Sequence, residues 1–67
     1  MPPKIRQLKA ALSKAGFSSR PGKGSHTVWI KAEIPDLEVT LSGKDGDDAE
    51  KYQIKQVQKA IKQAGEK

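Results

Sequence analysis

The spacing of apolar residues changes twice along this chain, and the two changes limit the folds open to it. Apolar side chains recur at spacings of three and four over residues 5–15, which is typical of an amphipathic helix. Over residues 37–41 they alternate with polar ones, as in a half-buried strand. The helical spacing returns over residues 54–64. The pattern predicts an α+β fold that begins and ends with a helix.

Turn-forming residues divide the region between the two helices. Gly16 is expected to end the first helix, which Pro3 opens near its first turn. Pro35 and Asp36 are expected to form the last turn of the sheet. Three short strands are predicted in this region, at residues 17–20, 26–30 and 37–41.

The second helix has a predicted start, an inner face and an outer face. Asp47 with Glu50 resembles a capping box at its start, and Gly65 lies near its end. The predicted inner stripe consists of Ile54, Val57, Ile61 and Ala64. Basic residues repeat along another face, at Lys51, Lys55, Lys59 and Lys62.

The predicted second strand raises the question of which side chains face the helices. If Val28 and Ile30 face them, Trp29 and Thr27 lie on the open face of the sheet. An exposed Trp29 would be an anchor for a binding partner or a stacked base. The alternative is that Trp29 covers a gap at the sheet edge.

The chain has 67 residues, a length that predicts one domain over residues 1–67 with a single thin core. It contains no cysteine. Disulfides and cysteine ligands are therefore ruled out. The N-terminal residues lack the uninterrupted apolar stretch of a signal peptide or a membrane span. A soluble, cytoplasmic protein with no membrane partner is expected.

Charges are segregated along the sequence. Residues 1–32 contain basic side chains and no acidic ones, residues 33–50 are mainly acidic, and residues 51–67 are mainly basic again. The net charge is +5, and the segregation predicts one basic side on the folded protein. Such a side suits a polyanion such as nucleic acid, and Lys51, Lys55 and Lys59 are candidate phosphate-binding residues. The alternative is a solvated surface that keeps the protein in solution.

The segment Gly22–His26 is the main candidate for chemistry. His26 is the only histidine, and imidazole both accepts and donates a proton near neutral pH. Lys23 and Ser25 provide a cation and a hydroxyl suited to a phosphate, and Gly24 lets the backbone approach a ligand closely. The alternative is an ordinary hairpin turn with a surface histidine.

No metal or other cofactor is expected. One histidine without cysteine argues against zinc, and Asp45, Asp47 and Asp48 form only part of a calcium loop. We interpret Asp47 and Asp48 as residues that begin the second helix. A Mg²⁺-dependent nuclease built on these two aspartates is a weaker alternative.

Three motifs together resemble one protein family. They are Ala15-Gly16-Phe17 at the end of the first helix, Gly22–His26 followed by Trp29, and Ile61–Gly65 in the last helix. The chain resembles the HicA-type toxins, including the YcfA-like branch, which are mRNA interferases of type II toxin–antitoxin modules. The resemblance covers nearly the whole chain. It implies an α-β-β-β-α fold like that of double-stranded RNA-binding domains, with a three-stranded antiparallel sheet and two helices on one face.

The resemblance also implies an activity and partners. The family's catalytic histidine corresponds to His26, with Gly24 and Ser25 as its motif neighbours. The chain would be a metal-independent endoribonuclease that cleaves mRNA, neutralised by a HicB-like antitoxin. Many members have a Pro-His pair after the third strand, where this chain has the acidic loop 42–48. Two alternatives remain: a non-catalytic RNA-binding module that needs the lysines, and a partner-binding protein without RNA activity.

Overall fold

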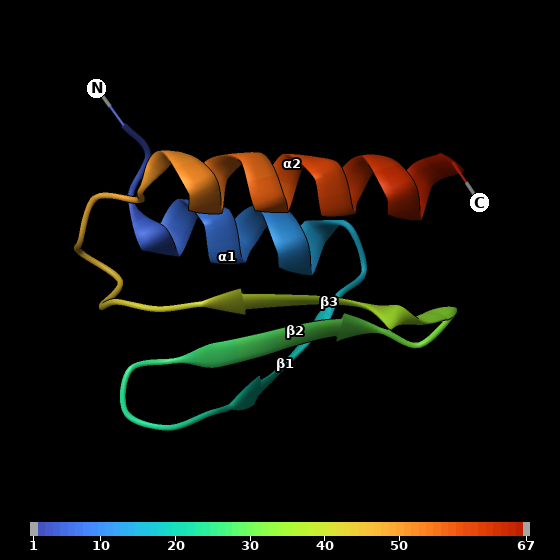
Figure 1. The fold of residues 1–67 in the computed structure, drawn as a ribbon, viewed down its shortest axis with the longest axis horizontal. Helices are drawn as coiled ribbons and strands as arrows, with labels where there is room; N and C mark the ends of the chain where they lie inside the picture. Colours follow the sequence, from blue (N-terminus) through green and yellow to red (C-terminus); the bar gives the residue numbers. More distant parts are fainter. Residues whose placement is uncertain (1, 67) are drawn as a thin grey trace.

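The structure is a computed structural model that describes the backbone of residues 2–66 and the side chains of residues 2–65. The two helices stack side by side on one face of the sheet (Figure 1). The elements in chain order are α1 (Ile5–Lys14), β1 (Ser18–Pro21), β2 (Thr27–Lys31), β3 (Ile34–Leu41) and α2 (Lys51–Glu66).

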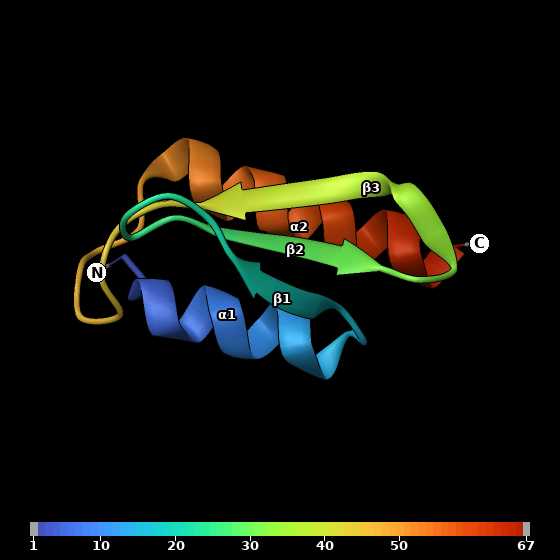
Figure 2. The same cartoon turned by 90° about the horizontal axis from the view of Figure 1, so that it is seen from below.

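The sheet is antiparallel, and its strands lie in the order β1-β2-β3. Seen from the sheet side, α1 runs beneath β1 and α2 runs behind β3 (Figure 2). Within residues 2–66, no helix lies over the opposite face of the sheet (Figures 1 and 2). The predicted α+β fold, with three antiparallel strands and both helices on one face, is confirmed.

The register of the sheet places Trp29 in the core. Trp29 pairs with Val39 and Thr27 pairs with Leu41, so all four share the face that meets the helices. Trp29 is only 7% exposed, and its indole N–H donates to Thr27 Oγ1 at 3.1 Å. The prediction that Trp29 and Thr27 lie on the open face is therefore wrong.

The physical reason is that every residue from Thr27 to Ile30 is a good strand former, so this segment has no polar alternation to fix its inner face. The core takes the face that buries the large indole. Val28 and Ile30 then pair with Thr40 and Glu38 on the open face, where they are half-buried.

The turn between β2 and β3 lies at Ala32 and Glu33, not at Pro35 and Asp36 as predicted. Lys31 pairs with Ile34 across this tight turn, and the register shifts beside it. Pro35 falls inside β3, which is an edge strand. A proline is tolerated there because an edge strand needs only half of its backbone groups for pairing.

The core lies between the helices and the inner face of the sheet. On α2 the predicted Val57 and Ala64 are buried, while Ile54 and Ile61 are partly buried at the flank of the stripe. The fully buried side chains with the largest volumes are Ile5, Leu12, Leu41, Val39 and Val57.

Both helices begin with the same device, a glutamine three residues after the capping residue. Lys4 N–H donates to Gln7 Oε1 at 2.6 Å, and Glu50 N–H donates to Gln53 Oε1 at 2.8 Å. The predicted capping box of Asp47 with Glu50 is wrong. Asp47 instead closes the preceding loop, because its Oδ2 accepts a hydrogen bond from the N–H of Lys44 at 3.0 Å.

Candidate functional site

The residues Gly22–His26 form a closed turn between β1 and β2, which we call the His26 turn. Gly22 N–H donates to the His26 carbonyl at 2.9 Å, and His26 N–H donates to the Lys23 carbonyl at 3.1 Å. Gly24 has a φ of 62°, a conformation that suits glycine. The backbone on both sides of His26 is thus held by hydrogen bonds within the turn.

Gly22 lies directly against His26. A Cβ added at Gly22 would stand 3.3 Å from the His26 carbonyl oxygen and 3.4 Å from its Cβ. A side chain at position 22 would therefore crowd the histidine. At Gly24, by contrast, nothing lies within 4 Å of an added Cβ, so a bound group has room to approach.

The imidazole of His26 is exposed and makes no hydrogen bond or ion pair with any other residue in the described part of the chain. Lys23, Gly24 and Ser25 are exposed beside it. The sequence-predicted His26, Lys23, Gly24 and Ser25 are thus brought together in one turn. An exposed imidazole can accept a proton from a bound molecule, and a neighbouring ammonium group can attract the negative charge of that molecule.

Ser25 connects the His26 turn to the loop after β3. Its Oγ accepts a hydrogen bond from Gly43 N–H at 3.3 Å. The hydroxyl hydrogen of Ser25 remains able to donate to an oxygen of a bound phosphate. Ser25 therefore has a structural contact in addition to the phosphate-binding role predicted for it.

Gln53 supports the same loop from α2. It is the one buried polar side chain among the described residues, at 2% exposure. Its amide nitrogen donates to the Ser42 carbonyl at 3.0 Å and lies 3.4 Å from Ser42 Oγ. The sequence patterns did not point to this residue. Its position three residues after the capping Glu50 was the only signal that could have indicated it.

The lysines of α2 lie far from the His26 turn in the fold. The buried residues of α2, among them Val57 and Ala60, face the sheet. At about 100° of rotation per residue, Lys51, Lys55, Lys59 and Lys62 fall on the opposite side of the helix. Figure 1 shows α2 at the top and the His26 turn at the lower left, where it joins the ends of β1 and β2. The four lysines are exposed, and none of them forms an ion pair with an acidic side chain of residues 2–65.

Among residues 2–65, four ion pairs neutralise part of the basic charge of the first half of the chain. Several basic residues of the first half pair with acids from elsewhere: Lys4 with Asp48 at 2.5 Å, Lys9 with Asp45 at 2.6 Å, Lys31 with Glu33 at 3.6 Å and Arg20 with Glu38 at 3.9 Å. Lys23 in the His26 turn and the four lysines of α2 are exposed and have no ion pair with an acidic side chain of residues 2–65.

The burial of Trp29 removes the exposure on which its predicted partner-binding role rested. Its ring packs in the core cluster that also contains Val39 and Leu41. Among the described residues, Tyr52 is the exposed large hydrophobic side chain, at 62% exposure.

The acidic loop has roles within the fold. Asp45 and Asp48 pair with lysines near the start of α1, and Asp47 closes its own turn. No three histidine, aspartate or glutamate side chains within residues 2–65 lie close enough together to hold a metal ion.

A helix, three antiparallel strands and a second helix, with both helices on one face, define a small α+β domain like the double-stranded RNA-binding domains. The family model described as the HicA toxin of bacterial toxin-antitoxin matches residues 5–66, and the chain belongs to that family. It is therefore a toxin of a toxin–antitoxin system, a class of protein that has an antitoxin as its partner.

No curated protein and no solved structure matches the chain. Within residues 2–66, none of the helices has the length and apolar character needed to cross a membrane.

Proposed function

We propose that this toxin is a metal-independent endoribonuclease that cleaves mRNA through His26 and is neutralised in the cytoplasm by a HicB-like antitoxin. Family membership supports the toxin class. The observation that best supports the activity is the state of His26. Its imidazole is exposed and has no hydrogen-bond partner among the described residues, while its backbone is held by hydrogen bonds within the turn. A general base must reach the proton it removes, and this imidazole is open to a bound strand.

The reaction uses a nucleophile that RNA itself contains. His26 takes the proton of a 2′-hydroxyl, and that oxygen attacks the adjacent phosphorus. The bond from phosphorus to the 5′-oxygen then breaks, leaving a 2′,3′-cyclic phosphate on one fragment. The released 5′-oxygen takes a proton from the imidazolium or from water, which yields a 5′-hydroxyl on the other fragment.

Lys23, Gly24 and Ser25 are the proposed phosphate-binding residues of the His26 turn. Charge grows on the phosphate oxygens during the attack, and a nearby ammonium group and hydroxyl stabilise it. The open space at Gly24 allows the backbone to come close to the phosphate. Tyr52, which also has an exchangeable proton, lies in the first turn of α2 and has no hydrogen bond to the His26 turn among the described residues.

The decisive experiment compares the wild type with His26→Ala on single-stranded RNA in excess EDTA. We expect the wild type to produce cyclic phosphate ends. The cleavage rate of His26→Ala is expected to be lower by a factor of at least about 100. Lys14→Ala is the matched control, because it removes an exposed charge at the far end of α1 and is expected to cleave normally.

Circular dichroism and antitoxin binding establish that His26→Ala is folded. Cleavage by folded His26→Ala at the wild-type rate would contradict the proposal. Loss of wild-type cleavage in EDTA, restored by Mg²⁺, would contradict its metal independence.

The lysine row of α2 favours a second candidate function, a non-catalytic RNA-binding module. Four exposed lysines without acidic partners in residues 2–65 follow one side of α2, from Lys51 to Lys62. Such a row can follow the phosphates of an RNA groove. This candidate predicts RNA retention that depends on the lysines and is unchanged in His26→Ala.

A further inference from the structure

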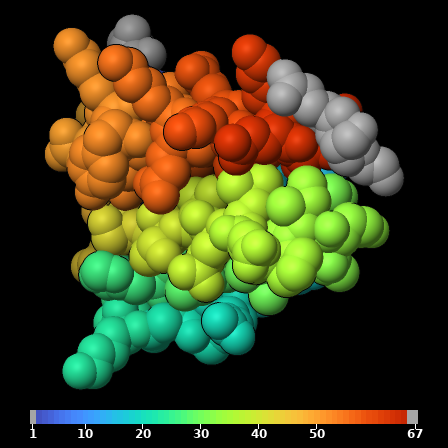
Figure 3. Space-filling view, turned by 45° about the vertical axis from the view of Figure 1, so that its right-hand side comes forward, coloured from blue at the N-terminus to red at the C-terminus, as the bar shows by residue number. Residues whose placement is uncertain are grey.

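The outer edge of β3 is unpaired in the described structure. The strand order β1-β2-β3 leaves one side of this eight-residue strand without a neighbour. Figure 3 shows β3, in yellow-green, as an exposed band directly below α2. A free edge of this length offers a template to which another extended chain can pair.

The register identifies the backbone groups that face outward. Gly22, directly after β1, donates its N–H to the His26 carbonyl, so the backbone groups of His26 face the β1 side. The backbone groups of successive residues in an antiparallel strand point in alternate directions, so those of Thr27 and Trp29 face β3. Their partners Leu41 and Val39 therefore direct their backbone groups inward. The backbone N–H and C=O groups of the intervening Thr40, and of Glu38, face the free edge.

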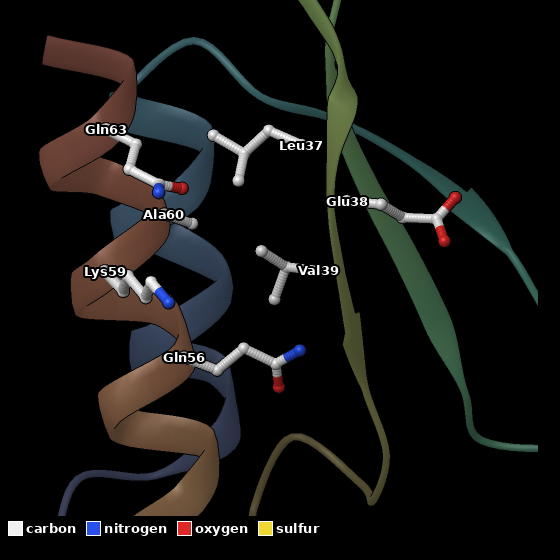
Figure 4. Close-up of a pocket in the computed structure, with 7 residues that line it drawn as sticks. All are labelled: Leu37, Glu38, Val39, Gln56, Lys59, Ala60 and Gln63. Atoms are coloured by element: carbon white, nitrogen blue, oxygen red, sulfur yellow. The ribbon is translucent and has the colours of Figure 1, made fainter. Parts of the chain in front are cut away.

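A groove runs between β3 and α2 beside this edge. Its volume is about 200 Å³, below the roughly 300–1,000 Å³ of a usual small-molecule site, so it suits one or two side chains. In Figure 4, Leu37 and Val39 project from β3 toward α2, and the carboxamides of Gln56 and Gln63 project from α2 toward β3. The groove thus has an apolar floor and hydrogen-bonding groups along its helix side.

Two charged residues line the groove, and their side chains differ in direction. Lys59 lines it from α2, whereas the carboxylate of Glu38 points away to the open side of the sheet (Figure 4), with Arg20 3.9 Å from it. Lys55 and Lys62 add further positive charge on the outer side of the same helix. An acidic ligand is therefore favoured next to this edge.

We propose that an extended, acidic segment of the partner antitoxin pairs with the free edge of β3 as a fourth strand. Its backbone pairs with Glu38 and Thr40, an aliphatic side chain fills the groove over Leu37 and Val39, and a carboxylate meets Lys59. The inference rests on the family membership of the chain and not on its ribonuclease activity. A second copy of the toxin fits poorly, because it would bring two lysine-rich helices together.

The first test is Thr40→Pro, measured by titrating the cognate antitoxin against the toxin. Proline removes the outward N–H of Thr40 without removing a hydrogen bond to β2, so the toxin is expected to stay folded. We expect antitoxin affinity to fall by about tenfold or more. RNA cleavage without antitoxin is measured in parallel and is expected to be unchanged, so failure of this inference is distinguishable from failure of the proposed function.

A second test uses two glutamines on α2. Gln63 lines the groove, and Gln58 is exposed on the same helix outside it. Gln63→Glu adds a negative charge that repels the acidic segment, so antitoxin affinity is expected to fall by about fivefold or more. Gln58→Glu adds the same charge elsewhere and is expected to change affinity by less than about twofold.

Three outcomes would overturn the inference. The first is antitoxin binding at wild-type affinity by folded Thr40→Pro. The second is an equal effect of Gln63→Glu and Gln58→Glu, which remains informative even if Thr40→Pro does not fold. The third is a dimer of the wild-type toxin, found by light scattering, that Thr40→Pro dissociates.

Discussion

Gly43 and Gly46 lie in the same loop after β3, but only Gly43 adopts a backbone conformation that requires glycine. Gly43 has a φ of 107°, and a Cβ there would stand 3.3 Å from Asp47 Oδ2 and 3.6 Å from Ile5 Cγ1. Gly46 has no positive φ, and no atom lies within 4 Å of an added Cβ. The two residues therefore provide a matched pair of alanine substitutions.

We predict that Gly43→Ala lowers the free energy of unfolding by about 1–2 kcal/mol, because alanine is strained at this φ. Gly46→Ala is expected to have no effect or to stabilise by up to about 1 kcal/mol, since it reduces the freedom of the unfolded chain. Urea denaturation followed by circular dichroism measures both. Equal effects of the two substitutions would show that the conformation of Gly43 is not what requires glycine.

Trp29 is the second residue whose surroundings make a measurable prediction. It is buried, whereas Tyr52 is an aromatic residue with a side chain exposed to solvent. Trp29→Ala is expected to lower the free energy of unfolding by about 3–5 kcal/mol. This is a large share of the total free energy of unfolding of a domain of this size. Tyr52→Ala is expected to change it by less than about 0.5 kcal/mol. Guanidinium denaturation followed by circular dichroism measures both variants. If Trp29 were exposed, as the sequence predicted, Trp29→Ala and Tyr52→Ala would both have small effects.

At the level of elements, the start of α2 is fixed to the loop after β3 by one buried side chain. Gln53 accepts a hydrogen bond from Glu50 N–H and donates to the carbonyl of Ser42. Gly43 N–H in turn donates to Ser25 in the His26 turn. A chain of hydrogen bonds thus runs from α2 through this loop to the candidate site.

We predict that Gln53→Met lowers the free energy of unfolding by about 1–3 kcal/mol, because it leaves the part-buried Ser42 carbonyl and the Glu50 N–H group without these partners. Gln58→Met, on the exposed side of the same helix, is the control and is expected to change stability by less than about 0.5 kcal/mol. Thermal unfolding measures both. A wild-type melting temperature for Gln53→Met would mean that the hydrogen bonds of Gln53 contribute nothing net to stability.

At the scale of the whole molecule, the His26 turn and the lysine row of α2 lie in different parts of the fold. The His26 turn joins β1 and β2 at one end of the sheet (Figure 1), and the helical spacing of the four lysines places them on the outer side of α2. Cleavage at His26 and retention by α2 are therefore expected to respond separately to substitution.

We predict that replacing Lys51, Lys55 and Lys59 together by alanine weakens RNA binding more at low salt than at high salt. Each lysine–phosphate pair contributes about 0.7–0.9 to the slope of log affinity against log salt, so removing three pairs reduces the slope by about 2–3. Filter binding over a range of salt concentrations measures this slope. Replacement of Lys4 and Lys9 is the control, because these lysines pair with Asp48 and Asp45. An unchanged slope in the triple variant would argue against phosphate binding by α2.

The sequence by itself determined the order and type of the elements, the inner residues Leu8 and Leu12 of α1, and the segment that forms the His26 turn. These features depend on local spacing and on glycine and proline, which are visible within a few consecutive residues. The end of α1 shortly before Gly16 followed from the same local information, and the structure gives this glycine a φ of 98°.

Only the tertiary structure decided which face of β2 is buried, where β3 begins and which charges are paired. Trp29 is a core residue through its pairing with Val39, ten residues away, and Lys4 pairs with Asp48, 44 residues away. The buried Gln53 and the free edge of β3 likewise depend on packing between distant segments. Pairing between distant segments produces no periodic pattern in the sequence. Each strand by itself is compatible with several registers and with either face turned toward the core.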